Sequence, residues 1–171
     1  MQKTIKIIIL LIFLFVVGIF YISLTRDTNY NTSSLINKET PEFKIISFDE
    51  TDFYTKNDLK KNNFTLINFW ASWCTPCKIE HPILMKLSQS KNLIITGVNF
   101  KDKESQAKTF LNKLGNPYDL LAKDKDGKQS VRFGVYGIPE SILINKESII
   151  IQKFVGPLSI DDYYSIIKII E

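Results

Sequence analysis

Two cysteines in one short stretch are the residues of this chain best suited to redox chemistry. Cys74 and Cys77 are its only cysteines, and they lie where an apolar strand pattern gives way to a helical one. Two residues between cysteines at a helix start allow a small disulfide ring, and the helix N-terminus stabilises the thiolate of the first sulfur. We therefore expect Cys74, with an exposed sulfur, to be the nucleophile, and Cys77 to resolve the mixed disulfide that Cys74 forms with a partner.

Other uses of such a cysteine pair find less support in the residues. A structural zinc site needs about four ligands, whereas this chain offers two cysteines and one histidine, His81. Covalent haem attachment through Cys-x-x-Cys-His is excluded because Lys78 follows Cys77. A purely structural disulfide remains an alternative, although so small a ring adds modest stability. We expect no metal or other cofactor, and we interpret His81 as a helix-surface residue.

The elements that must position the thiols follow an α/β pattern. Residues 64–71 form an apolar run typical of a central strand that is covered on both faces. The strand–helix–strand order that follows implies a right-handed parallel pair. Between 118 and 128 the sequence suggests a short apolar patch, 118–122, and a charged turn, 123–128. The full prediction has strands over 43–48, 64–71 and 93–100, helices over 75–90, 104–114, 130–136 and 160–170, and an antiparallel hairpin over 140–145 and 149–155.

The N-terminal segment predicts a membrane anchor. Residues 7–22 carry no charge, and at ~1.5 Å per residue a helix over 5–24 is about 30 Å long, enough to span a bilayer. A cleaved signal peptide is the alternative, but its apolar stretch is normally shorter and ends in small residues. We expect residues 1–4 to be a short cytoplasmic end, 25–40 a polar linker, and 41–171 one extracytoplasmic domain.

The charge of the chain argues against nucleic-acid binding. The net charge is +4, from 22 basic and 18 acidic residues. Two of the basic residues, Lys3 and Lys6, precede or begin the apolar segment, so the remainder carries about +2. The positive charges are scattered among acids, and a clustered basic footprint is lacking.

A second stretch, Gly134-Val135-Tyr136-Gly137-Ile138-Pro139-Glu140, accompanies the cysteine pair. It lies about sixty residues after the cysteines and leads into a predicted strand. In the predicted element order, Pro139 enters that strand beside the helix start that carries the thiols. A cis Ile138–Pro139 bond would suit a tight turn at such a place.

Several stretches together resemble one family. Trp70-Ala71-Ser72-Trp73-Cys74-Thr75-Pro76-Cys77 looks like the thioredoxin active site. Cys77-Lys78-Ile79-Glu80-His81-Pro82, Gly97-Val98-Asn99-Phe100-Lys101-Asp102, Gly115-Asn116-Pro117-Tyr118 and 134–145 narrow the likeness to the membrane-anchored CcmG/DsbE proteins of cytochrome c maturation. The resemblance runs from about Pro41 to Gly156.

This resemblance implies a thioredoxin fold, a mixed central sheet flanked by helices, with a redox-active Cys74–Cys77 disulfide and a cis bond at Pro139. It implies a periplasmic reductant, held in the bacterial inner membrane by one helix, that keeps the haem-binding cysteines of apocytochrome c reduced. Electrons would come from a DsbD or CcdA type membrane protein and pass to apocytochrome c directly or through a CcmH-type thiol protein. The expected substrate groove comprises Trp73, Thr75, Pro76, Tyr136, Ile138, Pro139 and Glu140.

Two acidic residues match the family pattern near the sulfurs. Glu80 lies three residues past Cys77 on the same helix side. A carboxylate there would oppose thiolate formation and could move protons during exchange. Asn68 stands where ordinary thioredoxins carry a buried Asp, and since an amide takes up no proton at neutral pH, Glu80 is the candidate for that task. Solvated, inactive roles for Glu80 and Glu140, and a core or a shielding role for Trp73, remain open.

Two other functions compete with this prediction. One is an anchored thioredoxin-like reductase that serves other exported proteins and acts on unrelated disulfides. The other is a client-binding module in which the groove beside Ile138–Pro139 holds an unfolded protein and the thiols are incidental. A Cys74→Ala variant that kept full activity would support the second.

Overall fold

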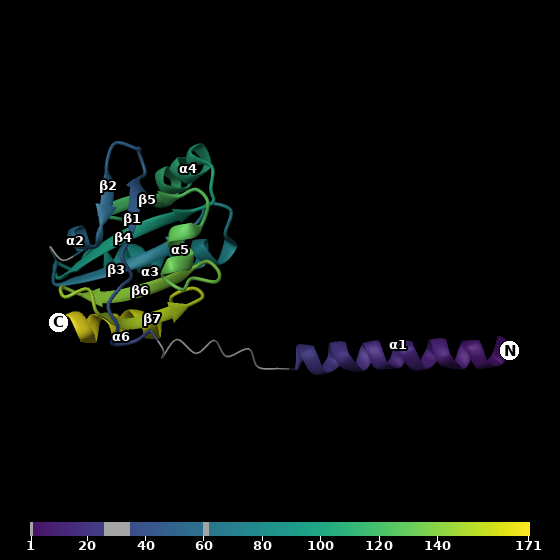
Figure 1. The fold of residues 1–171 in the computed structure, drawn as a ribbon. Coiled ribbons are helices and arrows are strands. Elements are labelled where there is room, and N and C mark those ends of the chain that lie inside the picture. The colour runs from purple at the N-terminus through teal and green to yellow at the C-terminus, as the bar shows by residue number, and fades with distance from the viewer. Residues whose placement is uncertain (1, 26–34, 60–61) are drawn as a thin grey trace. The chain divides into compact units, whose positions relative to one another are not determined.

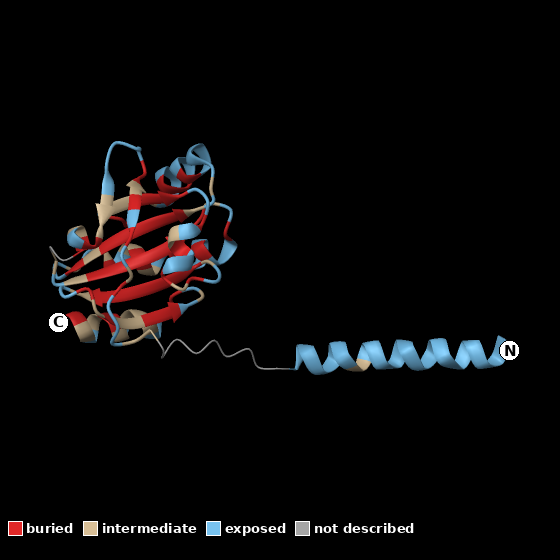
Figure 2. Ribbon diagram, in the orientation of Figure 1, coloured by how far each residue is buried: buried red, intermediate tan, exposed pale blue. Residues whose placement is uncertain are grey.

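The N-terminal helix and the folded domain form two separate units, and each is described by itself. The structure, a computed structural model, describes residues 2–25, 35–59 and 62–171. Helix α1 (Gln2–Leu24) has no buried residue and is exposed almost throughout (Figure 2). Its first turn contains no acidic residue. By length and composition it could cross a membrane, a test that a signal sequence also passes. The span predicted at 5–24 lies within it.

The folded domain is built on one mixed sheet of seven strands in the order β2-β1-β5-β4-β3-β6-β7 (Figure 1). The central strands β3 (Phe64–Trp70) and β4 (Leu93–Phe100) are parallel, as predicted, and β4 is also parallel to β5 (Leu120–Asp124). The predicted hairpin is confirmed as β6 (Glu140–Asn145) and β7 (Ile150–Val155), with β6 antiparallel to β3. The active-site segment therefore follows the carboxyl end of a central strand.

The sheet separates two apolar clusters, and its central strands are buried in Figure 2. One face is covered by α3 (Thr75–Leu87), α4 (Glu104–Leu114) and α6 (Ile160–Ile170), which contribute residues such as Leu84, Phe110 and Ile166. The other face is covered by the N-terminal segment of the domain, α2 (Lys56–Leu59) and the region after α5 (Lys128–Arg132), with Leu59 and Phe133 buried. Side chains that alternate along a strand therefore enter different clusters.

The domain begins earlier than the boundary expected at Pro41. Leu35 and Ile36 pack against the second cluster. The backbone N–H of Asn37 donates to the Ile150 carbonyl at 2.8 Å, and that of Thr40 donates to the Ser148 carbonyl at 2.8 Å. Residues 35–40, assigned to the linker, thus join the edge of the hairpin, while 26–34 lie outside the described residues.

Several predicted elements need correction. The first strand is shorter, β1 (Lys44–Ser47), and pairs with an unpredicted strand, β2 (Phe53–Thr55). The stretch 123–128 is not wholly a turn, because β5 runs on through Lys123 and Asp124. Both are buried: Lys123 pairs with Glu50 at 2.8 Å and Glu104 at 2.9 Å, and Asp124 accepts hydrogen bonds from Ser130. The helix predicted at 130–136 is α5, at 128–132, and α3 ends at Leu87, where Ser88 caps it.

Candidate active site

The disulfide between Cys74 and Cys77 occupies the start of α3. Cys74 is the N-cap residue, with extended backbone angles, and its Sγ accepts the backbone N–H of Cys77 at 3.2 Å. Pro76 lies in the first turn, where the missing N–H of proline costs no helical hydrogen bond. The free N–H groups of the helix thus face the first sulfur, as predicted, and favour negative charge on it when the disulfide is reduced.

The sulfur of Cys74 is less exposed than predicted. Cys74 is only 4% exposed and Cys77 2%. The reason is the segment before β6, whose Ile138 carbonyl oxygen lies 3.6 Å from Cys74 Sγ. In the disulfide this sulfur carries no hydrogen, so the approach is a van der Waals contact; after reduction a thiol could donate along it.

The Ile138–Pro139 peptide bond is cis, in agreement with the prediction. Glu140 fixes the preceding turn: its Oε1 accepts the backbone N–H groups of Tyr136 at 2.9 Å and Gly137 at 3.0 Å. Its Oε2 pairs with Lys153 Nζ at 2.8 Å, and both side chains are buried. Glu140 is therefore not solvated, and it positions the turn that contacts Cys74.

Glu80 is also buried, with no solvent exposure. Its Oε1 accepts from Asn68 Nδ2 at 2.9 Å and its Oε2 from the Leu158 backbone N–H at 2.9 Å. Burial raises the pKa of Glu80 from 4.5 to about 7, against the opposing effect of these two hydrogen bonds. In the described part of the chain no lysine or arginine pairs with this carboxyl group. Glu80 can therefore exchange a proton near neutral pH, one helical turn beyond Cys77.

Tyr118 is a neighbour of this site that was not predicted to be functional. Its hydroxyl donates to Asn68 Oδ1 at 2.9 Å. Its ring stacks on Trp70, with centroids 5.4 Å apart, and burial raises the pKa of Tyr118 well above its usual value. Gly97, inside an apolar strand, was the sequence feature that could have indicated this contact. A glycine within a strand often marks a place where another group packs closely against the backbone.

His81 is not a surface residue. It is 3% exposed, its Nε2 lies 3.1 Å from the Gly115 carbonyl oxygen, and its ring meets the edge of Phe110. Burial lowers the pKa of His81. The prediction failed because α4 covers the side of α3 that carries position 81, and a tertiary contact of that kind leaves no trace in the local pattern.

Trp73 precedes Cys74 in the chain and is 56% exposed, so it is not a core residue. Its indole N–H donates to the Lys101 carbonyl at 3.2 Å. Asp102 holds the same two loops together, since its carboxylate accepts from the backbone N–H of Ser72 at 2.6 Å and from the Ser72 hydroxyl at 2.8 Å. Asp102 therefore stabilises the loop that precedes Cys74, a role that was not predicted from the sequence.

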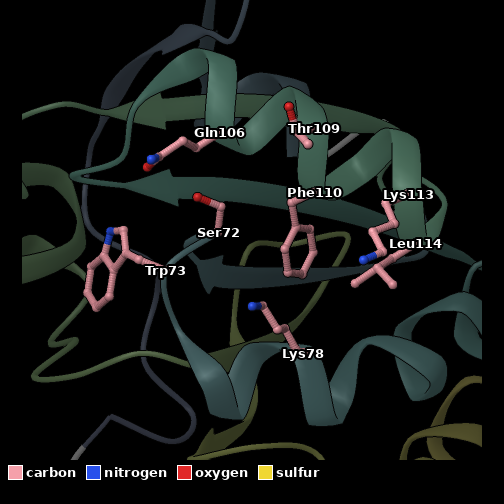
Figure 3. A pocket seen from close by; sticks show the side chains of 8 residues that line it. All are labelled: Ser72, Trp73, Lys78, Gln106, Thr109, Phe110, Lys113 and Leu114. Carbon is pink, nitrogen blue, oxygen red and sulfur yellow. The ribbon is translucent and has the colours of Figure 1, made fainter.

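Two grooves meet at Trp73. One, of about 450 Å³, lies between α3 and α4, where Lys78 and Phe110 project toward each other and Trp73 stands at one end (Figure 3). The other, of about 730 Å³, is lined by Trp73, Tyr136 and Ile138, the residue whose carbonyl oxygen contacts Cys74. Of the expected groove residues, these three line the second groove. Thr75 and Pro76 are exposed at the start of α3, whereas Pro139 and Glu140 are buried and do not line it.

Comparisons with known proteins agree with this geometry. The Redoxin family model matches residues 36–167. The thiol:disulfide interchange protein HelX of Rhodobacter capsulatus is 36% identical, over 94% of this chain and 92% of its own. DsbE of Pseudomonas aeruginosa is 40% identical, over 91% of this chain and 86% of its own, and DsbE of Escherichia coli is 36% identical, over 93% and 89%.

Among solved structures, the thioredoxin domain of a thiol-disulfide oxidoreductase from Bacteroides vulgatus superposes with a TM-score of 0.67 at 24% identity, covering 80% of this chain and 98% of that domain. That likeness supports the thioredoxin-like α/β fold. The disulfide at a helix start, the turn that contacts Cys74 and the similarity over most of the chain lead to one conclusion. The chain is a thiol:disulfide oxidoreductase that belongs to the DsbE/CcmG/HelX family of thiol:disulfide interchange proteins.

Proposed function

We propose that this protein is a periplasmic reductant of the haem-binding cysteines of apocytochrome c, acting in cytochrome c maturation directly or through a CcmH-type thiol protein. The observation that carries the proposal is the Cys74–Cys77 disulfide at the start of α3, in contact with the turn before Pro139. Family membership supplies the pathway. The redox group is the cysteine pair itself.

In the proposed reaction, the Cys74 thiolate attacks one sulfur of a client disulfide. A mixed disulfide forms, and the other client sulfur leaves as a thiolate and takes up a proton. Cys77 then loses its proton and attacks Cys74 Sγ, which forms the Cys74–Cys77 disulfide and expels the second client sulfur. Two electrons and two protons pass to the client, and the protein ends in the form that the structure describes.

Glu80 is the proposed acceptor of the Cys77 proton. It lies one turn beyond Cys77 on the same helix side, it is buried with the sulfurs, and its pKa of about 7 suits proton exchange at neutral pH. As a carboxylate it also opposes the formation of a second negative charge on the thiols. Because it destabilises the thiolate of the reduced pair, this effect lowers the reduction potential and suits a reducing role.

The proposed client site is the groove between Trp73 and Tyr136. Both residues are largely exposed, at 56% and 78%, and Ile138, which contacts Cys74, lines the same groove. An extended segment of client chain can place its sulfur over Cys74 there while its apolar neighbours contact the two rings. Thr75 and Pro76 border the sulfur from the helix side. Pro139 and Glu140 act from beneath by holding the turn.

We further propose that α1 remains attached and spans the inner membrane once, with residues 1–4 in the cytoplasm and the domain that follows the linker in the periplasm. The length and apolar character of α1 support this arrangement, as do Lys3 and Lys6 at its start. A DsbD or CcdA type membrane protein would return electrons to the Cys74–Cys77 disulfide.

The test uses the reduced full-length chain in lipid nanodiscs and a peptide disulfide of the sequence Cys-x-x-Cys-His. We expect this peptide to be reduced much faster than insulin, an unrelated disulfide protein. Cys77→Ser should trap the peptide covalently on Cys74, and the matched variant Cys74→Ser should trap none. Equal rates for both substrates would support a general reductase instead, and full biological activity of Cys74→Ala would support a binding module.

A further inference from the structure

Asn68 occupies the centre of the sheet and makes three side-chain hydrogen bonds. Its Nδ2 donates to Glu80 Oε1 and to Ser141 Oγ, both at 2.9 Å, and its Oδ1 accepts from the Tyr118 hydroxyl at 2.9 Å. Asn68 and Ser141 have no solvent exposure and Tyr118 has 7%. In this orientation the amide nitrogen faces Glu80 and Ser141, and the amide oxygen faces Tyr118.

The place of Tyr118 is built into the sheet. Asn68 pairs across the sheet with Ser141 on β6 and with Gly97 on β4. A Cβ at Gly97 would lie 2.6 Å from Tyr118 Cγ and 2.7 Å from Tyr118 Cδ1, well inside any tolerable contact. The Tyr118 ring therefore fills the space that a side chain at position 97 would take, and its hydroxyl reaches Asn68 from there.

The hydrogen bonds around Glu80 suit a carboxylate and not a carboxylic acid. Each of its oxygens faces a donor, Asn68 Nδ2 or the Leu158 N–H. A proton added to Glu80 would point at one of these donors, which removes a hydrogen bond inside the core. The backbone at Leu158 cannot turn. The Asn68 amide can, because its terminal torsion has two roughly equivalent orientations.

A half-turn of the amide would satisfy the protonated state. Asn68 Oδ1 would then accept the Glu80 O–H, and Nδ2 would face the Tyr118 oxygen. A tyrosine hydroxyl both donates and accepts, so Tyr118 can serve either orientation. A phenol donates more strongly than it accepts, however, so Tyr118 favours the orientation with Oδ1 toward its hydroxyl. We propose that Asn68 and Tyr118 are positioning residues for Glu80, and that the Asn68 amide reverses when Glu80 takes up a proton. This inference rests on the proposed function, in which that proton comes from Cys77.

Few other titratable groups surround Glu80. From α3 itself they are Cys77 and His81, and His81 lies against the Gly115 carbonyl. From the segment before β5 the group is Tyr118. The buried pair Glu140–Lys153 lies on the opposite face of the sheet, with the second apolar cluster. The Asn68–Tyr118 link is therefore a hydrogen-bonded route by which a side chain remote from Glu80 can bias its proton.

The Tyr118 hydroxyl should favour the ionised form of Glu80. With Oδ1 toward Tyr118, the hydroxyl donates to Asn68, and this orientation gives Nδ2 to the Glu80 carboxylate. Loss of the hydroxyl removes that preference and leaves the acid form relatively favoured. Tyr118→Phe keeps the ring over Gly97, and we expect it to raise the pKa of Glu80 by roughly half to one pH unit, on the scale of one net hydrogen bond.

The test is infrared spectroscopy of the oxidised full-length chain in nanodiscs over a pH series. The carbonyl stretch of a protonated, buried carboxyl group reports Glu80, and Glu80→Gln identifies the band by removing it. The band should disappear at a higher pH in Tyr118→Phe than in the wild type. Tyr164→Phe, which changes an exposed tyrosine, should leave the midpoint unchanged. An unchanged or lowered midpoint in Tyr118→Phe would overturn the proposal.

A second measurement needs no variant of Tyr118. In a chain with isotope-labelled tyrosine, the C–O stretch should shift from a donor to an acceptor signature as Glu80 becomes protonated, and Glu80→Gln should abolish the shift. A tyrosine band that stays constant through the Glu80 titration would exclude the amide reversal. Peptide reduction by the wild type is measured separately, so a failed reductase assay counts against the proposed function and a failed titration counts against this inference.

Discussion

The buried Glu80 carboxyl group should make the stability of the domain fall as pH rises. The pKa of Glu80 is about 7 in the folded, oxidised protein and 4.5 as the ordinary value. Between these values the folded chain holds a proton that the unfolded chain has lost, so the folded state binds more protons and each rise in pH destabilises it. Well below pH 4.5 the carboxyl group is protonated in both the folded and the unfolded state, and well above pH 7 it is ionised in both.

The size of the effect follows from the same two values. At ~1.4 kcal/mol per pH unit, the interval between 4.5 and about 7 corresponds to about 3 kcal/mol of unfolding free energy. This is the net cost of a buried carboxylate after its hydrogen bonds from Asn68 and Leu158 are included. It is a large share of the 5–15 kcal/mol that is typical of a folded domain, by order of magnitude.

Glu80→Gln provides the measurement, because glutamine keeps the shape of the side chain and does not titrate. Urea unfolding of the oxidised full-length chain can be followed by the fluorescence of Trp70 and Trp73, its two tryptophans. From about pH 4 to about pH 8, the unfolding free energy of the wild type relative to the variant should decrease by about 3 kcal/mol. Burial also lowers the pKa of His81, but that effect is common to both proteins and cancels.

The control is Glu147→Gln, which changes an exposed carboxyl group and should leave the pH dependence of the wild type intact. A constant difference between the wild type and Glu80→Gln across the whole range would refute the argument. It would mean that Glu80 gains as much from its surroundings when ionised as it loses through burial. The role of Glu80 as a proton acceptor at neutral pH would then lose its basis.

Three further outcomes are expected. Glu80→Gln should lower the apparent pKa of the thiols and raise the reduction potential measured in glutathione buffers, and no change or the opposite change would remove Glu80 from the mechanism. Gly97→Ala should lower the unfolding free energy by about 1–3 kcal/mol through its clash with Tyr118; equal losses in the wild-type and Tyr118→Ala backgrounds would contradict that contact. Lys153→Met should lower the unfolding free energy by about 3–5 kcal/mol, because it leaves the carboxylate of Glu140 buried without its cationic partner. Adding Glu140→Gln to this variant should recover part of the lost stability. A double variant that is no more stable than Lys153→Met alone would show that the ion pair is not the cause.

Local signals in the sequence were sufficient for the centre of the fold. The apolar run of β3, the cysteine pair at the start of α3 and the spacing to β4 predicted the parallel strands and the position of the disulfide. The turn in the hairpin β6–β7 was equally plain. These features depend on residues close in the chain, where periodicity and turn chemistry decide the structure.

Long-range contacts were responsible for the errors. The charges of Lys123 and Asp124 indicated a turn, but Glu50, Glu104 and Ser130, all distant in sequence or held by tertiary structure, allow those charges to be buried in β5. His81 was misplaced for the same reason, because α4 covers it. A polar residue is exposed by default, and only the folded neighbours reveal an exception.

Glu80 and Glu140 both belong to the sequence motifs of the family, but they lie on opposite faces of the sheet. Ser141 points toward Asn68 and the face that holds α3, so its neighbour Glu140 must point to the other face, where Lys153 and two backbone N–H groups bind its carboxylate. Because Lys153 balances its charge, Glu140 can remain ionised and hold the turn that contacts Cys74 in place. Glu80 lies on the thiol side, and among the described residues no cation balances its charge. This difference supports the proposal that Glu80 accepts the proton of Cys77 and that the Asn68 amide reverses when it does.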